Sequence, residues 1–284
     1  MSEQRALVTG ASRGIGKAIA VDLAKAGFDV ALAARTLRKG DPTLDHTMSI
    51  HAPDARPLPG TLEETAELVE AAGVKALPVR MDLLDLASVD AAVTTVLDEW
   101  GGVDVVVNNG RHIGPGLMDT ILDTPIDEYT KFLQAHGTSA IRIVQLTLPG
   151  MLERARGTFV TISSGAGYDF YPSNAPGSGG GAGLGYRIGK AAGHTLVGSI
   201  LVEYSDRGIR AFNVNPGFVR TERNTMGAEV TGMDPSLGAP PEAVGAAVAW
   251  MVTSPEADGL MRGNIDAQTV AVERGLYPDW RSGS

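Results

Sequence analysis

The 284-residue sequence contains no cysteine, few histidines and no surplus of basic residues. Without cysteine, the chain can form neither a disulfide nor a thiolate nucleophile. Its five histidines are scattered and form no H-x-x-x-H or comparable cluster, so we do not expect a metal site. The formal net charge of −9 argues against nucleic acid as a partner, because phosphate backbones require a basic surface.

The sequence also lacks an apolar run long enough to span a bilayer. Its first residues, MSEQRALVTG, do not follow the basic, apolar and small-residue order of a signal peptide. The hydrophobic content of 43% and the charged content of 20% are ordinary for a soluble globular protein. We therefore expect a cytoplasmic protein that has no membrane partner.

Short apolar segments alternate with helical stretches along the chain. Segments typical of buried parallel strands are RALVTG, FDVALAAR, ALPVRMD, VDVVVNN, GTFVTISS, GIRAFNVNPG and, near the C-terminus, NIDAQTVAV. Helices are expected at about 87–100, 126–153 and 185–206, and Pro78 favours an edge position for its strand. This alternation predicts an α/β fold, with a doubly wound Rossmann-type parallel sheet of about seven strands.

No repeat or linker divides the chain, so residues 1–284 are predicted to form a single dinucleotide-binding and catalytic domain. Two segments interrupt its regular rhythm, and both follow predicted strands. Residues 36–60 carry four prolines and no clear periodicity, and residues 172–185 are rich in glycine. A third segment, 218–240, is expected to form a lid over the substrate. Loops this long in a compact domain usually carry function or are disordered.

A glycine-rich turn joins the first predicted strand to the first helix. In TGASRGIG, Gly10, Gly14 and Gly16 permit a tight turn and the close approach of a pyrophosphate to backbone N–H groups at the helix N-terminus. The spacing is G-x-x-x-G-x-G rather than the G-x-G-x-x-G of the dinucleotide fingerprint. Its position between a strand and an amphipathic helix favours nucleotide binding over a simple turn.

The second strand ends in Arg35 instead of an acidic residue. An aspartate there would accept hydrogen bonds from a ribose 2′-OH, whereas an arginine suits a 2′-phosphate. Arg13 and Arg35 are both placed to reach such a phosphate, which favours NADP(H) over NAD(H). The alternative is that either arginine faces solvent.

Tyr186 and Lys190 stand four residues apart in GLGYRIGKAAG, so they share one face of a helix. A nearby ammonium favours the phenolate and lowers the tyrosine pKa from its usual value of about 10. The tyrosine can then donate and accept a proton near neutral pH. Alone, the pattern is common, and an exposed helix with a solvated lysine is then the favoured explanation.

The ordered set TGASRGIG, VNNG, ISS, YRIGK and NVNPGFVRT resembles the short-chain dehydrogenase/reductase family over essentially the whole chain. The segment LPGTLEETAELVEAAG is similar to one in hydroxysteroid-dehydrogenase-like members. The resemblance implies that Tyr186 is a general acid or base and that Lys190 holds the nicotinamide ribose. It also implies that Ser164 donates a hydrogen bond to the substrate carbonyl.

The resemblance further implies a set of cofactor-binding residues around the nucleotide. Within it, Asp82 and Leu83 border the adenine, and Asn108 and Gly110 border the adjoining ribose. The full predicted set is Gly10, Ser12, Arg13, Gly14, Ile15, Gly16, Arg35, Asp82, Leu83, Asn108, Gly110, Tyr186, Lys190, Pro216, Gly217, Val219 and Thr221.

Three features depart from the family pattern. His136 stands where the family usually has an asparagine that supports a proton-relaying water, and we add it to the predicted catalytic residues; a buried histidine without a role is the alternative. Arg111 follows VNNG where the family has a small residue, and its role is open. Ser164 and Tyr186 lie 22 positions apart, a longer separation than usual, so the glycine-rich loop must fold back for them to meet.

These residues predict an NADP-dependent oxidoreductase that transfers a hydride between the nicotinamide and a small-molecule carbonyl or secondary alcohol. A cofactor-binding protein without redox activity, or an epimerase or dehydratase on the same fold, would be the alternatives. Met226, Val230 and Met233 suggest an apolar pocket wall, or the packing of a short helix. A homodimer or homotetramer is expected, joined through helices 126–153 and 185–206.

Overall fold

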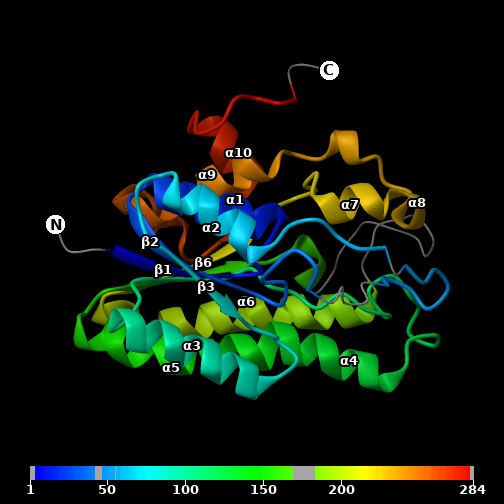
Figure 1. The fold of residues 1–284 in the computed structure, drawn as a ribbon, viewed down its shortest axis with the longest axis horizontal. Coiled ribbons are helices and arrows are strands. Elements are labelled where there is room, and N and C mark those ends of the chain that lie inside the picture. The colour runs from blue at the N-terminus through cyan, green and yellow to red at the C-terminus, as the bar shows by residue number, and fades with distance from the viewer. Residues whose placement is uncertain (1–3, 42–46, 55, 169–182, 282–284) are drawn as a thin grey trace.

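The computed structural model describes residues 4–41, 47–54, 56–168 and 183–281 (Figure 1). Its single sheet has seven parallel strands in the order β3-β2-β1-β4-β5-β6-β7. The strands are β1 (Gln4–Thr9), β2 (Phe28–Ala34), β3 (Ala76–Arg80), β4 (Val105–Asn108), β5 (Gly157–Ile162), β6 (Ile209–Asn215) and β7 (Asn264–Asp266). The strand order reverses between β1 and β4, so a crevice is expected at their carboxyl ends. The predicted doubly wound α/β fold is confirmed.

Helices cover both faces of the sheet (Figure 1). One face carries α1 (Gly14–Lys25), α2 (Leu62–Glu70), α9 (Pro241–Thr253) and α10 (Ala267–Glu273). The other carries α3 (Leu86–Trp100), α4 (Ile126–Leu133), α5 (Ser139–Glu153) and α6 (Leu184–Tyr204). Among the described residues, no helix combines the length and the apolar character that crossing a membrane requires.

The strands are apolar on both faces because helices cover both. In β1, Ala6 and Val8 pack with α1 and α9, whereas Leu7, between them, packs with α3 and α5 on the opposite side. All three side chains are completely buried. Burying a leucine-sized side chain contributes roughly 1.5–3 kcal/mol. The apolar runs therefore drive the formation of both layers around the sheet.

Most of the predicted elements are present, and two differ. The helix expected over 126–153 is interrupted by a π-helical turn, Gln134–Thr138, between α4 and α5. The strand expected over NIDAQTVAV is wrong after Asp266, because α10 begins at Ala267. Asp266 starts the helix by accepting a hydrogen bond from the Thr269 backbone N–H at 2.8 Å. Pro78 lies in β3 at the edge of the sheet, as expected.

The interrupting segments follow carboxyl ends of strands. The described parts of 36–60 contain only an isolated bridge between Ser49 and Ala52. Of the glycine-rich segment 172–185, residues 172–182 lie outside the described residues. Segment 218–240 contains α7 (Glu222–Met226) and α8 (Ala228–Thr231). A bridge from Val219 to Ala239 joins the two ends of this segment.

Candidate active site

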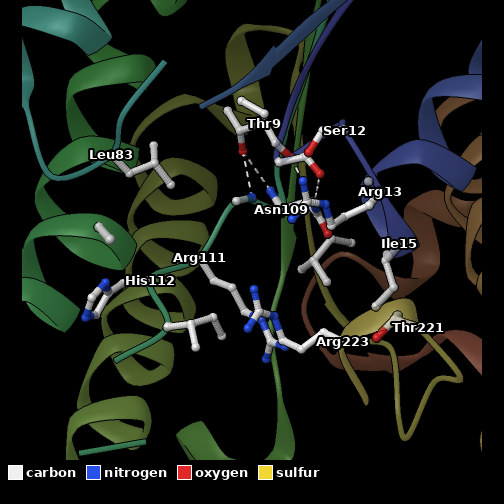
Figure 2. A pocket seen from close by; sticks show the side chains of 18 of the residues that line it. Thr9, Ser12, Arg13, Ile15, Leu83, Asn109, Arg111, His112, Thr221 and Arg223 are labelled. Atoms are coloured by element: carbon white, nitrogen blue, oxygen red, sulfur yellow. Dashed lines mark hydrogen bonds between the residues drawn. The ribbon is translucent and has the colours of Figure 1, made fainter. Parts of the chain in front are cut away.

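A pocket of about 250 Å³ opens at the carboxyl ends of the central strands (Figure 2). It collects almost every predicted cofactor residue, together with Ser164. The predicted residues that line it are Gly10, Ser12, Arg13, Gly14, Ile15, Gly16, Arg35, Asp82, Leu83, Gly110, Ser164, Tyr186, Lys190, Pro216, Gly217, Val219 and Thr221. Asn108 and His136 are not among its lining residues and border a smaller cavity instead.

The glycine-rich turn is tied to β4 by Thr9 and Asn109 (Figure 2). The Thr9 Oγ1 accepts hydrogen bonds from the backbone N–H groups of Asn109 at 3.0 Å and Gly110 at 2.9 Å. The Asn109 Nδ2 donates to the carbonyl oxygens of Thr9 at 2.9 Å and Gly10 at 3.3 Å. Asn109 therefore positions the turn. The sequence prediction gave a role to Asn108, its neighbour in VNNG, and missed this one.

The glycines of the turn meet two different requirements. Gly10 and Gly14 have φ values of +67° and +52°, a region that side-chain-bearing residues rarely adopt. Gly16 is needed for space, because a Cβ atom there would lie 2.2 Å from the Gly10 carbonyl oxygen. The start of α1 thus packs directly on the turn and aims its first N–H groups into the pocket.

We expect Gly16→Ala to lower the free energy of unfolding by about 1–3 kcal/mol, as other overpacked sites do. Gly198→Ala is the matched control, because Gly198 lies on the exposed side of helix α6, where an added Cβ atom would meet no other atom within 4 Å. It should raise stability by up to about 1 kcal/mol through helix propensity. Urea unfolding measures both changes, and a Gly16→Ala protein as stable as the wild type would contradict the close packing.

Two arginines face the pocket beyond the end of β2. Arg13 donates from Nη2 to the Gly60 carbonyl oxygen at 2.8 Å and to the Thr36 Oγ1 at 3.3 Å. Burial lowers the pKa of both Arg13 and Arg35, and the charge of Arg35 lowers that of Arg13 further. Among the described residues, Asp82 is the acidic group that opposes the shift at Arg35. This pair forms an electropositive corner that suits an anion.

Tyr186, Lys190 and Ser164 meet at the opposite side of the pocket. Tyr186 lies in the first turn of α6, and the Lys190 Nζ is 5.6 Å from the centre of its ring. Lys190 is buried, and its Nζ donates to the Ile162 carbonyl oxygen at 2.7 Å. Ser164 directly follows Ser163 at the end of β5 and is hydrogen-bonded to Tyr186. Three of the four predicted catalytic residues therefore lie together, despite the long separation of Ser164 from Tyr186 in sequence.

The charges around Tyr186 favour its phenolate. Burial by itself raises the pKa of Tyr186, whereas the positive charges of Lys190 and Arg111 lower it. Hydrogen bonds from Ser164 and Arg111 act in the same direction, so the pKa lies below its usual value. The Arg111 guanidinium carbon is 6.0 Å from the centre of the tyrosine ring. Arg111, whose role the sequence left open, thus acts on the tyrosine directly.

A second cavity of about 20 Å³ lies behind Lys190 and is bordered by Asn108 and His136. Both polar side-chain atoms of Asn108 are buried without a hydrogen-bond partner among the described residues. The His136 Nε2 accepts a hydrogen bond from the His112 backbone N–H at 3.1 Å. Burial, followed by the charges of Lys190 and Arg111, places the pKa of His136 well below its usual value, so the ring is neutral. The cavity has room for about one water molecule between polar groups.

His194 is a residue that the sequence analysis missed. It lies one turn after Lys190 on α6, and its Nε2 contacts the Ser163 Oγ. Its ring also packs edge-on against Tyr168, with centroids 5.3 Å apart. These contacts hold the segment after β5, which carries Ser164, against α6. In the sequence, His194 is marked only by its position four residues after Lys190, and this spacing is too common to identify a role.

Segment 218–240 presents mostly polar residues to the pocket. Arg223 and Asn224 line it, whereas Met226 and Met233 do not. The side chain of Val230 lies outside the described residues. The apolar pocket wall that the methionines suggested is therefore not formed by the two of them that the structure describes.

A family model described as short chain dehydrogenase matches residues 4–63 and 56–229. The chain therefore belongs to the short-chain dehydrogenase family. It is 31% identical over 223 residues to glycine betaine reductase ATRR of Emericella nidulans, covering 78% of this chain but 15% of that protein. It is 30% identical over 217 residues to 2-(R)-hydroxypropyl-CoM dehydrogenase of Xanthobacter autotrophicus, covering 76% of this chain and 74% of the relative.

The fold is also similar to that of a solved alcohol dehydrogenase. An alcohol dehydrogenase from the archaeon Thermococcus sibiricus, complexed with 5-hydroxy-NADP, aligns with a TM-score of 0.68 at 25% identity. The alignment covers 93% of this chain and 94% of that one. The chain is thus an oxidoreductase of this family with the family's Rossmann-type architecture.

Proposed function

We propose that this protein is an NADP-dependent oxidoreductase that interconverts a carbonyl compound and a secondary alcohol. The observation that carries the proposal is the contact of Tyr186 with Ser164 and with the charges of Lys190 and Arg111, in the same pocket as the glycine-rich turn. The relatives support it, since one is named a dehydrogenase of a 2-hydroxypropyl compound and another an alcohol dehydrogenase bound to an NADP derivative.

The pocket residues fit a nicotinamide dinucleotide phosphate. Helix α1 packs closely on the glycine-rich turn, because a Cβ atom at Gly16 would collide with the Gly10 carbonyl oxygen, and the N-terminus of α1 borders the pocket through Gly14 and Gly16. At the end of β2, Arg13 and Arg35 supply two positive charges for a 2′-phosphate. Lys190 lies beside Tyr186, where it would hold the nicotinamide ribose.

The residues around Tyr186 supply the acid–base chemistry of the reaction. When bound, the nicotinamide supplies a hydride to the carbonyl carbon or accepts one from the alcohol carbon. In reduction, Tyr186 donates its proton to the carbonyl oxygen while Ser164 donates a hydrogen bond to the same oxygen. In oxidation, the Tyr186 phenolate accepts the alcohol proton. The positive charges of Lys190 and Arg111 stabilise that phenolate in both directions.

Proton return to Tyr186 is proposed to pass through Lys190 and the cavity behind it. A water molecule there would contact the Asn108 amide, which has no other partner among the described residues. His136 borders the same cavity from the π-helical turn, and such turns occur frequently at functional sites. His136 would then take the place of the relay asparagine that the resemblance led us to expect.

The pH dependence of alcohol oxidation tests this assignment, once a screen of alcohols and ketones has identified a neutral substrate. As the pH rises through the pKa of Tyr186, the phenolate forms and kcat/KM for oxidation should increase. Arg111→Met removes a charge that lowers this pKa, so the rise should move to higher pH. A profile that keeps its midpoint in the variant would contradict Tyr186 as the base.

The homo-oligomer and the substrate lid stay predictions. Helices α4, α5 and α6 carry exposed apolar side chains at Ile126, Ile141 and Val202, with exposed fractions of 77%, 46% and 83%. These faces support the expected association. The lid assignment is supported by α7, because its residue Arg223 reaches the pocket.

A further inference from the structure

Arg111 and Arg223 extend into the pocket toward each other from opposite walls (Figure 2). Arg111 follows β4 and is hydrogen-bonded to Tyr186. Arg223 lies in α7, and its Nη1 is buried without a hydrogen-bond partner among the described residues. Burial lowers the pKa of Arg223 to about 9, and the charge of Arg111 contributes to the same shift. Asp54, which is paired with Arg56 at 2.7 Å, opposes this shift only in part. Among the described residues, no carboxylate forms an ion pair with Arg111 or Arg223, so two guanidinium groups face the same space without an acidic partner.

The acidic groups of the pocket are engaged elsewhere. Among the described residues, the only acidic side chains that line it are Asp82 and Glu222. Glu222 contacts the Lys17 Nζ through Oε1 at 3.4 Å and its charge acts on Arg13, while its Oε2 has no hydrogen-bond partner among the described residues. Asp82 acts on Arg35. His112 also lines the pocket, but burial lowers its pKa to about 4, so it is neutral at pH 7. The space between Arg111 and Arg223 is thus strongly electropositive.

A buried guanidinium needs an anionic partner, because desolvation without one is costly. Resting on the proposed function, we propose that the substrate supplies this partner as a carboxylate. Arg111 and Arg223 bind that group, so the substrates are oxo acids and the corresponding hydroxy acids. Such a charged substrate differs from what the apolar pocket wall suggested by Met226 and Met233 would bind.

The position of Arg111 limits where the carboxylate stands on the substrate. The Tyr186 hydroxyl that hydrogen-bonds to Arg111 is the same group that would donate its proton to the carbonyl oxygen. The guanidinium therefore lies beside the carbonyl, within reach of a carboxylate on the adjacent or the next carbon. A guanidinium binds a carboxylate through two parallel hydrogen bonds, which also orients the substrate. A 2-oxo or 3-oxo acid satisfies this geometry.

The reaction on such a substrate balances without a further reactant. The carbonyl carbon gains a hydride from NADPH, the carbonyl oxygen gains the Tyr186 proton, and the carboxylate remains unchanged. The products are the hydroxy acid and NADP⁺, and solvent returns the proton to Tyr186. The reverse direction oxidises the hydroxy acid by the same steps.

The pyrophosphate of the cofactor is the other source of anionic oxygens in this pocket. Arg223 is two residues from Thr221, which is a predicted cofactor residue. The experiment must therefore separate a substrate anion from a cofactor anion. It must also distinguish a failure of the proposed substrate class from a failure of the proposed function.

We compare 2-oxo and 3-oxo acids with their methyl esters, which have the same carbon skeleton but no charge. In the wild type, kcat/KM should favour an acid over its ester by at least about 10-fold. Arg111→Met and Arg223→Met should each lower kcat/KM for the acid by about 10–100-fold, as expected for lost hydrogen bonds to a charged group. Arg220→Met is the control, because Arg220 is an exposed residue of the same segment outside this pocket.

Calorimetry separates binding from turnover. In Tyr186→Phe with NADPH bound, the acid should bind more tightly than its ester, and Arg223→Met should remove the difference. The dissociation constant for NADPH should stay within about twofold in both arginine variants.

Weaker NADPH binding with no change in acid-over-ester preference would overturn the inference in favour of the pyrophosphate. Reduction of neutral ketones without any preference for acids would overturn it while leaving the proposed function intact. If neither class is reduced, the proposed function fails as well.

Discussion

Replacing Tyr186 with phenylalanine is expected to lower kcat for carbonyl reduction by about 10²–10⁴-fold, which is the range of a general acid. The variant keeps the aromatic ring and loses only the hydroxyl that contacts Ser164 and Arg111. Hydride transfer to the carbonyl carbon would then leave negative charge on the carbonyl oxygen, with no proton donor in place. Binding of NADPH should change little, because the glycine-rich turn and Arg35 are untouched.

Tyr204→Phe is the matched control for this experiment. Tyr204 is the last residue of the same helix, α6, and does not line the pocket. It should keep the wild-type kcat, which shows that loss of a tyrosine hydroxyl from α6 does not by itself impair the enzyme. Single-turnover reduction and NADPH fluorescence titration measure the two effects separately. Full turnover by Tyr186→Phe would show that another group donates the proton.

Residues that belong to local patterns were predictable from the sequence. The glycine-rich turn and the Tyr186–Lys190 spacing each follow from the geometry of one element, a strand-to-helix turn or one helical turn. Likewise, apolar strands predicted the buried parallel sheet, because both of its faces are covered by helices. The error at β7 arose where AQTVAV fits a helix as well as a strand, and the Asp266 cap decides between them.

Residues that act through distant contacts were not predictable in the same way. Arg111 and Arg223 lie 112 positions apart in sequence, and only the fold brings them to one pocket. Asn108 and Asn109 are neighbours, yet Asn109 positions the glycine-rich turn while Asn108 faces the cavity behind Lys190. Alternate residues of an extended chain point to opposite sides, so a shift of one position changes the role completely.

The charge of the pocket is opposite in sign to the net charge of the protein. The chain carries a formal net charge of −9, whereas the pocket is lined by four arginines and Lys190. A local positive potential inside an acidic protein concentrates small anions at the pocket and repels them from the rest of the surface. The cofactor phosphates and an oxo-acid substrate would both benefit from it. Since screening weakens such effects, binding of each should fall as salt is added.

The cofactor preference should depend on Arg35. Replacing it with serine removes a charge-assisted contact to the 2′-phosphate, so the dissociation constant for NADPH should rise by about 10–100-fold while that for NADH changes little. Arg35→Asp should go further and favour NADH, because the carboxylate repels the phosphate and accepts hydrogen bonds from a ribose 2′-OH.

Arg38→Ser is the control for this change of charge. Arg38 is three residues further along, exposed, and paired with Glu63 at 2.8 Å rather than directed into the pocket. Its loss removes the same charge from the same loop and should leave both dissociation constants unchanged. Fluorescence titration with each cofactor measures the selectivity directly. If Arg35→Ser weakened the binding of NADPH and NADH equally, Arg35 would support the pocket without contacting the 2′-phosphate. Arg13 would then be the remaining candidate for that contact.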